Sequence, residues 1–260
     1  MAQRTSTLSV LFLGPELTPL AKAGGLGDVL GALPPALYSL GVDARVVLPF
    51  YGSIPHSRSI HRLASYEVLF GGRRERVHVF LTTIPKTSVP VYLLQHRWFD
   101  GTAIYLHGRK ILDRKRGIYT RHAKDVERFA FFSRAALDLL PAIRWQPQIL
   151  HGHDWFFGLI PVWLKTTERC HPFFSSMRTI LTIHNLANQG IAPLPILRRA
   201  GLQATHLPSL ERDAINRDID LLAQGILNAD QLTTVSPQYA KEILTPAYGE
   251  HLDPLLRRRR

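Results

Sequence analysis

Sulfur is scarce in this sequence, whose 260 residues include one cysteine and two methionines. The single cysteine, Cys170, excludes a disulfide framework and any zinc site built on cysteines. The chain also lacks an apolar run of about 20 residues, the length that a membrane-spanning helix needs. Before Pro15 there is no apolar core long enough for a signal peptide. We therefore expect a cytoplasmic protein with no membrane segment.

Acidic residues are also in deficit, because 20 of them face 32 lysines and arginines and leave a net charge of +12. A nucleic-acid binder would gather its cations with aromatic residues on one face. Here the cations are scattered in small groups, which an anionic small substrate or a solvated basic surface explains equally well. We predict no nucleic-acid partner. The arginines at 257–260 are expected to belong to a disordered basic tail over residues 251–260.

What the sequence does contain is a regular alternation of apolar and amphipathic segments, and 45% of its residues are hydrophobic. This alternation predicts a single Rossmann-like, doubly wound parallel sheet of the α/β class. The stretch 96–120 shows no clear period and is expected to be a long loop. Strands are predicted at 8–13, 42–49, 63–70, 76–84, 90–95, 148–151, 178–184 and 231–235. Helices are predicted from the end of the glycine-rich turn to about residue 40, and at 123–140, 155–165, 193–200, 213–228 and 236–244.

A glycine-rich turn follows the first predicted strand, where Lys22 to Leu33 reads K-A-G-G-L-G-D-V-L-G-A-L. Glycine lets the backbone approach a ligand closely, and Lys22 adds a positive charge. A strand, a turn of this kind and a helix can present phosphate to backbone N–H groups at the helix N-terminus. A tight turn with no ligand explains the pattern equally well.

Polar clusters stand at the ends of three other predicted strands, at 151–155, at 184–185 and at Ser236. Because ligands gather at the carboxyl ends of parallel strands, we expect these clusters to share one rim with the glycine-rich turn. Each cluster has a simpler explanation, since Asp154 could cap a helix, His184 could lie in the core and Ser236 could be a cap. His151 and His153 have a metal-like spacing, but with few carboxylates nearby we predict no metal site.

Taken together and in order, these segments resemble the bacterial glycogen synthases and plant starch synthases. The segment at 22–29 is similar to the family's K-T-G-G-L-x-D-V, with Ala23 in place of threonine. The segment at 151–155 resembles H-x-H-D-W. The segment at 182–190 resembles T-x-H-N-L-A-Y-Q-G, with Asn188 in place of tyrosine, and 234–243 resembles T-V-S-P-x-Y-A-x-E-I.

The resemblance implies the GT-B fold, in which two Rossmann-like domains face each other across a cleft. It implies retaining transfer of glucose from ADP-glucose to the non-reducing end of an α-1,4-glucan, with no metal or other cofactor. Residues 1–250 would be the N-terminal catalytic domain. A separate C-terminal domain would supply the rest of the donor site. A non-catalytic relative that binds glucan or nucleotide remains the alternative.

The same resemblance assigns roles to individual residues. Lys22 would contact the donor phosphate together with Gly24 and Gly25, since a cation and loop N–H groups stabilise the negative charge of departing ADP. His184 would lie beside the transferred glucose, and Asp154 on the sugar and acceptor side. The other substrate-binding residues expected on these grounds are Asp28, Tyr119, His153, Asn185 and Gln189.

Overall fold

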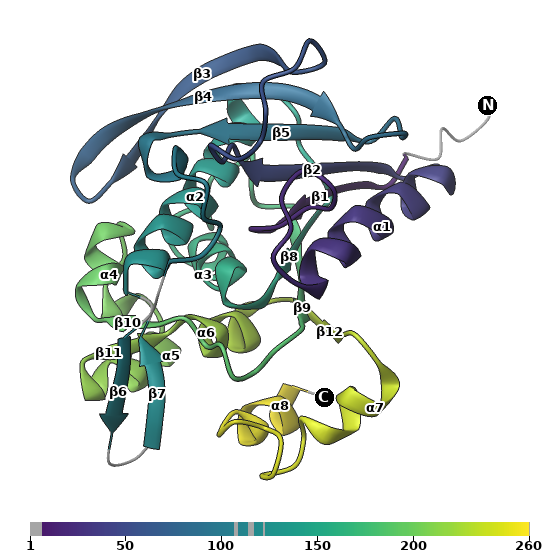
Figure 1. Ribbon diagram of the computed structural model, residues 1–260. Coiled ribbons are helices and arrows are strands. Elements are labelled where there is room, and N and C mark those ends of the chain that lie inside the picture. The colour runs from purple at the N-terminus through teal and green to yellow at the C-terminus, as the bar shows by residue number, and fades with distance from the viewer. Residues whose placement is uncertain (1–6, 107–108, 114–116, 122, 260) are drawn as a thin grey trace, which may run out of the picture.

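One eight-stranded sheet organises the molecule (Figure 1). The computed structural model describes residues 7–106, 109–113, 117–121 and 123–259, and it describes side chains outside the stretch 107–123. In spatial order the strands are β12 (Gln231–Thr234), β9 (Arg178–Ile183), β8 (Ile149–His153), β1 (Ser9–Leu13), β2 (Asp43–Pro49), β5 (Pro90–Gln95), β4 (Arg73–Thr83) and β3 (His61–Phe70). The six from β12 to β5 are parallel, and β4 and β3 extend the sheet as an antiparallel hairpin.

The burial of the strands follows from their place in the sheet. The central strand β1 is buried along almost its whole length, as expected for a parallel strand that is covered on both faces. The edge strand β3 alternates between exposed and less exposed positions, because one of its faces meets solvent. The apolar runs of the sequence therefore predicted the inner strands well.

Helices cover both faces of the sheet. They are α1 (Gly25–Ser39), α2 (Ala123–Ala142), α3 (Leu159–Lys165), α4 (Pro195–Arg199), α5 (Pro208–Asp213), α6 (Leu221–Asn228), α7 (Pro237–Glu242) and α8 (Asp253–Arg259). The connection through α1 runs from β1 to β2, whereas those through α3 and α6 run toward β12. Because such crossovers are right-handed, helices of opposite connections lie on opposite faces, and the predicted doubly wound sheet is confirmed. None of the helices described has the length and apolar character that crossing a bilayer would require.

The order of the strands reverses between β1 and β8. The chain leaves β1 toward β2, and it leaves β8 in the other direction, toward β9. Leu13 at the end of β1 pairs with Gly152 near the end of β8, so the carboxyl ends of these two strands lie side by side. A reversal of this kind opens a crevice at the carboxyl ends of the strands, where α/β proteins bind their ligands.

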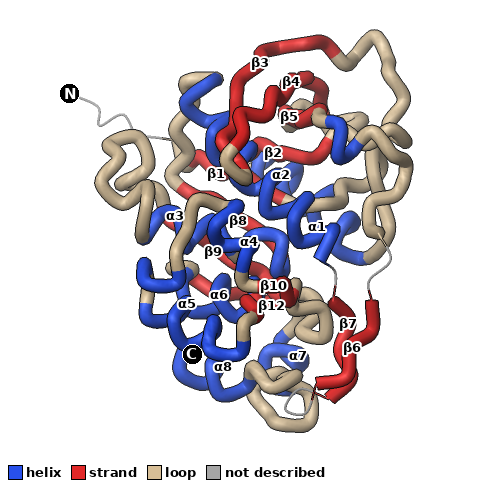
Figure 2. Tube along the Cα trace, turned by 90° about the vertical axis from the view of Figure 1, so that its left-hand side faces the viewer, coloured by secondary structure: helices blue, strands red, loops and turns tan. Residues whose placement is uncertain are grey.

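Two stretches differ from the prediction. The expected long loop at 96–120 includes a hairpin of β6 (Arg109–Asp113) and β7 (Gly117–Arg121), which extends away from the main sheet beside β10 (Ile191–Pro193; Figure 2). The expected helix at 213–228 begins only at Leu221, after the short strand β11 (Asp218–Asp220). Asp220 ends that strand and starts the helix, since its side chain accepts a hydrogen bond from the backbone N–H of Ala223 at 2.9 Å.

The expectation of a disordered tail at 251–260 is wrong for Asp253–Arg259, which form α8. The arginines of this helix have partners in the fold. Arg257 donates to the backbone oxygen of Leu244 at 2.8 Å, and Arg259 donates to that of Ile226 at 3.0 Å. Leu256 is buried on the same helix. Arginines near a helix end commonly bind free carbonyls of this kind. Here Arg259 ties α8 to α6, and Arg257 ties it to the segment that follows α7.

Candidate functional site

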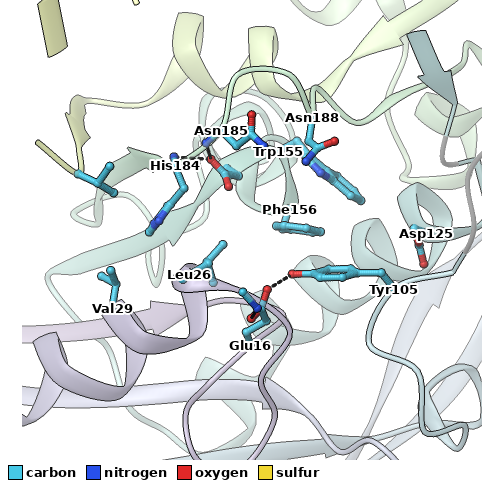
Figure 3. Close-up of a pocket in the computed structure, with 14 residues that line it drawn as sticks. Glu16, Leu26, Val29, Tyr105, Asp125, Trp155, Phe156, His184, Asn185 and Asn188 are labelled. Carbon is cyan, nitrogen blue, oxygen red and sulfur yellow. Dashed lines mark hydrogen bonds between the residues drawn. The ribbon is translucent and has the colours of Figure 1, made fainter. Parts of the chain in front are cut away.

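A cavity of about 580 Å³ lies at the carboxyl ends of β1, β8, β9 and β12, beside the β1–β8 reversal (Figure 3). Five of the ten residues that the sequence predicted for the site line it, namely Gly24, Gly25, Asp154, His184 and Asn185. The other lining residues are Glu16, Leu26, Val29, Tyr105, Asp125, Trp155, Phe156, Asn188 and Val235. Three of the four expected clusters therefore share this rim, whereas at the fourth the neighbouring Val235 lines the cavity and Ser236 does not.

The glycine-rich turn is held by a carboxylate that the sequence analysis did not select. Glu16 is 3% exposed and accepts hydrogen bonds from the backbone N–H groups of Ala23 at 2.8 Å and Gly24 at 2.6 Å. It also accepts one from the hydroxyl of Tyr105, and Figure 3 shows this contact. Two amides of the turn are thus already paired. The backbone donors left for a ligand are those of the first turn of α1, from Gly25 onward.

Gly25 stands where that first turn meets the cavity. A Cβ placed on it would meet no protein atom within 4 Å, and the position is exposed. The fold's own packing therefore does not require glycine at this position. At Gly27, by contrast, the packing of the fold does favour glycine, because an added Cβ would lie 3.0 Å from a carboxylate oxygen of Glu16.

Lys22 and Asp28 form an ion pair beside the cavity. The Lys22 ammonium donates to both carboxylate oxygens of Asp28, at 2.7 and 2.8 Å, and each side chain is about half exposed. The hydrogen bond from Lys22 is the main cause that lowers the pKa of Asp28. Neither residue is among those that line the cavity in the described part of the chain.

Asp154 joins two strands rather than capping a helix. Its Oδ1 accepts from the backbone N–H groups of His184 at 2.7 Å and Asn185 at 3.3 Å (Figure 3). Its backbone φ is +49°, a left-handed conformation that is uncommon outside glycine. Burial raises the pKa of the Asp154 carboxyl to about 7. The simpler explanation as a helix cap is wrong, because this side chain fixes the segment that follows β9.

Three histidines run from the interior of the sheet to the cavity. His184 lines the cavity and is half-buried, and its Nε2 lies 2.9 Å from Nδ1 of the fully buried His153. His151 stacks on His153 with ring centroids 5.0 Å apart, and its Nε2 lies 2.7 Å from the hydroxyl of Thr182. Burial lowers the pKa of all three rings, so they are neutral at pH 7.

The remaining predicted residues lie elsewhere. Gln189 donates to the backbone oxygen of Glu250 at 2.8 Å and so ties its loop to the chain that precedes α8. The backbone of Tyr119 belongs to β7, but its side chain is outside the described part. Ser236 caps α7 by accepting from the backbone N–H of Tyr239 at 3.0 Å, as the simpler explanation expected. Within the described ranges, no cluster of three or more His, Cys, Asp or Glu side chains could hold a metal ion.

Aromatic side chains form a floor that sequence reasoning missed. The rings of Tyr105 and Phe156 stack with their centroids 5.8 Å apart, and the ring centroids of Phe156 and Trp155 are 4.0 Å apart. Tyr105 was hidden in the stretch without periodicity, and no local pattern marks it. Glu16 carries a weak signal, since it is a lone carboxylate just past the carboxyl end of β1. Asn188 was noted only as a departure from a motif.

Known proteins resemble this chain along nearly its whole length. It is 39% identical over 254 residues to a glycogen synthase of Anoxybacillus flavithermus, a match that covers 97% of this chain and 49% of that protein. A glycogen synthase of Bacillus subtilis is 37% identical over 256 residues, with the same coverage. The chain thus spans about half the length of the curated relatives it matches.

A solved structure has the same fold. It is the catalytic domain of starch synthase IV from Arabidopsis thaliana bound to ADP and acarbose, with a TM-score of 0.84 and 28% identity. The match covers 98% of this chain and 50% of that one. A family model described as the starch synthase catalytic domain matches residues 9–258. With a cavity built from the motif segments at the end of its parallel sheet, this chain belongs to the family of starch synthase catalytic domains.

Proposed function

We propose that this chain forms one side of the active cleft of a glycogen (starch) synthase, which transfers glucose from ADP-glucose to the non-reducing end of an α-1,4-glucan with retention. One observation carries the proposal: four segments far apart in the sequence, each resembling a family motif, line a single cavity at the strand reversal. The neighbour bound to ADP and acarbose, a nucleotide and an oligosaccharide analogue, supports the same substrate classes.

The donor phosphates would lie at the glycine-rich turn. Negative charge grows on ADP as the glycosidic bond to glucose breaks, and donors aimed at that charge stabilise the transition state. The free N–H groups at the start of α1, from Gly25 onward, are suited to this because a helix N-terminus attracts anions. The Lys22 ammonium is close by on a flexible stem. Its pairing with Asp28 is open to solvent, so a pyrophosphate could recruit it from that partner.

The glucosyl and glucan groups would lie over the aromatic floor. Tyr105, Phe156 and Trp155 offer apolar faces, and the polar side chains of His184 and Asn185 line the same cavity (Figure 3). Apolar walls with a few placed polar groups are typical of small-molecule sites. Asp154 would act on the sugar side, both through its own carboxyl and by holding the backbone of the His184 segment in place.

The transfer, as the family resemblance implies, uses no metal or other cofactor. A second α/β domain would close the cleft and supply the remaining phosphate and base contacts, because leaving-group stabilisation needs donors on both sides. The proposed setting is the cytoplasm.

The test is calorimetric titration of the chain with ADP and, separately, with maltohexaose. We expect weak binding of both to the wild-type chain, and loss of ADP binding in Gly25→Ala, whose new methyl group would occupy the ligand's space. Gly25→Ala should fold normally, since nothing lies within 4 Å of the added carbon. Gly101→Ala is the matched control, with equally open surroundings outside the cavity. Absence of ADP binding by the wild-type chain, or equal binding by Gly25→Ala, would contradict the proposal.

A second candidate is a module that binds glucan or nucleotide without turnover, since the same cavity could hold a ligand without transferring glucose. Transfer from labelled ADP-glucose to glycogen separates the two. We expect little transfer by this chain alone, and clear transfer when it is fused to the C-terminal half of the Bacillus subtilis relative. Ligand binding without transfer in both cases would favour the binding module.

A further inference from the structure

The contacts of the buried His153 restrict where its proton can be. Its side chain is fully buried at the end of β8. Nδ1 lies 2.9 Å from Nε2 of His184, a distance that requires one of these nitrogens to donate to the other. Among the described residues, Nε2 of His153 has no hydrogen-bond partner, and it is the sole buried side-chain nitrogen or oxygen of which this holds.

A neutral imidazole has one N–H and one acceptor nitrogen. If the His153 proton were on Nε2, a buried donor would point at no acceptor among the described residues. If it is on Nδ1, the donor is used and only an acceptor lone pair is left unpaired. Orphaned buried N–H groups are rarer in folded proteins than under-used acceptors, so the second arrangement is favoured. His151 stacks on the other side of this ring and bonds to Thr182, so it offers Nε2 no partner.

The choice at His153 determines the state of His184. When Nδ1 of His153 donates, Nε2 of His184 must accept, and the proton of the neutral His184 ring then belongs to Nδ1. That second nitrogen has no partner among the described residues, and it is not buried. Since His184 lines the cavity, its free N–H is available to a ligand there.

We propose that His153 is a positioning residue, which donates from Nδ1 to Nε2 of His184 and so holds His184 in the tautomer that offers an Nδ1–H donor to the cavity. His184 then serves as a hydrogen-bond donor to a hydroxyl or phosphoryl oxygen of the ligand and not as a proton acceptor. Only the identity of that ligand rests on the proposed function, because the tautomer follows from the contacts within the chain.

The groups that face the pair would leave this arrangement undisturbed near neutral pH. His151 and Thr182 lie behind His153, Asp154 binds the backbone of His184, and Glu16 lies across the cavity. Burial lowers the pKa of both His153 and His184 from the ordinary histidine value, and that of His153 strongly. Both rings should therefore keep a single proton from about pH 7 upward, where the assignment can be read.

The test is nitrogen NMR of the histidine rings in the full chain, labelled with ¹⁵N-histidine and free of ligand. Signals of His184 and His153 are assigned by their loss in single substitutions. At pH 7.5 we expect both rings to show the pattern of a proton on Nδ1. A proton on Nε2 of either ring in the wild-type chain would overturn the proposal.

Variants separate positioning from mere packing. In His153→Asn the side-chain amide nitrogen can replace Nδ1 as donor, so His184 should keep its Nδ1–H form. In His153→Leu the donor is gone, and His184 should become a mixture of tautomers. His151→Gln is the matched control and should leave His184 unchanged. An unaltered Nδ1–H form in folded His153→Leu would refute the proposal, and if that variant does not fold, the wild-type spectrum and His153→Asn decide. Because no ligand is used, failure of ADP or glucan to bind would count against the proposed function alone.

Discussion

The two walls of the cavity hold their polar groups in different ways. On the wall formed by the ends of β8 and β9, Asp154 and His153 are buried and bonded to His184. Beside the wall formed by the glycine-rich turn, and outside the cavity lining, Lys22 and Asp28 pair in solvent. One wall has its groups set in place before a ligand arrives, while the cation beside the other wall is exposed and held by an ion pair in solvent.

This difference has an energetic side. The buried wall contains a carboxyl with a raised pKa and a left-handed backbone at Asp154, both of which lower the stability of the fold. Unfavourable features of this kind tend to persist where they serve a site. On the wall formed by the glycine-rich turn, Glu16 is the buried charged group. Its carboxylate accepts hydrogen bonds from two backbone amides of the turn and so holds the turn in place. The comparison predicts large effects on stability at the first wall and small ones at the exposed pair.

The largest effect is expected for Asp154→Asn. The pKa of its carboxyl is about 7 in the fold, against an ordinary value of 3.8 in the unfolded chain. Above pH 7 the fold therefore carries a buried negative charge, which in the unfolded chain is solvated by water. The neutral amide keeps the acceptor oxygen and removes that charge. At pH 8 the variant should be more stable than wild type by about 4 kcal/mol, and the gap should close as the pH falls to about 4. Urea unfolding from pH 4 to pH 8 measures the difference in the free energy of unfolding between the variant and wild type. A difference that does not change with pH would contradict the prediction.

A second effect of opposite sign is expected at His151, behind the same wall. Burial lowers the pKa of the His151 ring from 6.5 to about 4. Between these two pH values the ring is therefore protonated in the unfolded chain and neutral in the folded protein. Through this residue wild type should lose about 3 kcal/mol as the pH falls from 6.5 to 4. In His151→Gln the side chain binds no proton and can still reach Thr182. The free energy of unfolding of this variant should therefore fall by about 3 kcal/mol less than that of wild type over the same pH range. If the free energies of unfolding of the two proteins fell equally with pH, the His151 ring would not be held neutral by the fold.

A third, intermediate effect is expected at Glu16. Glu16→Ala leaves the amides of Ala23 and Gly24 and the hydroxyl of Tyr105 without their acceptor. Because a buried polar group left unpaired costs about 1–3 kcal/mol, we expect a loss of about 2 kcal/mol in the free energy of unfolding. Glu16→Gln keeps one acceptor oxygen and should lose less. Faster amide exchange at Gly24 in the alanine variant would locate the damage, and unchanged exchange would mean that Glu16 does not hold the turn.

Sequence patterns predicted the sheet and five of the fourteen residues that line the cavity for one physical reason, which is that both depend on where strands end. Gly24, Asp154 and His184 each follow a buried strand, and parallel strands bring such residues to one edge. The contact of Asp154 with the His184 backbone was out of reach, because it depends on the pairing of β8 with β9. Glu16 and Tyr105 meet only through the folded loop.

The errors in the fold have a related cause. Local propensity was overruled by contacts between distant segments. Residues 253–259 look like a charged tail in isolation, but their arginines bind carbonyls of Ile226 and Leu244. The stretch 213–228 looks helical throughout, but β11 pairs with β10 and interrupts it. Neither partner is visible within a local window of sequence.

The smallest effect on stability is expected for Lys22→Ala, which removes an exposed ion pair and leaves no buried group behind. Pairs in solvent contribute little, so the free energy of unfolding should match wild type within error. ADP binding should nevertheless weaken about tenfold, since a phosphate would lose one charge-assisted hydrogen bond. Lys241→Ala, an exposed lysine on α7 outside this cavity, is the control and should change neither quantity. Calorimetric titration and urea unfolding of both variants make the comparison. A large loss of stability in Lys22→Ala, or unchanged ADP affinity, would mean that the exposed wall is fixed by Lys22 and not kept mobile for the ligand.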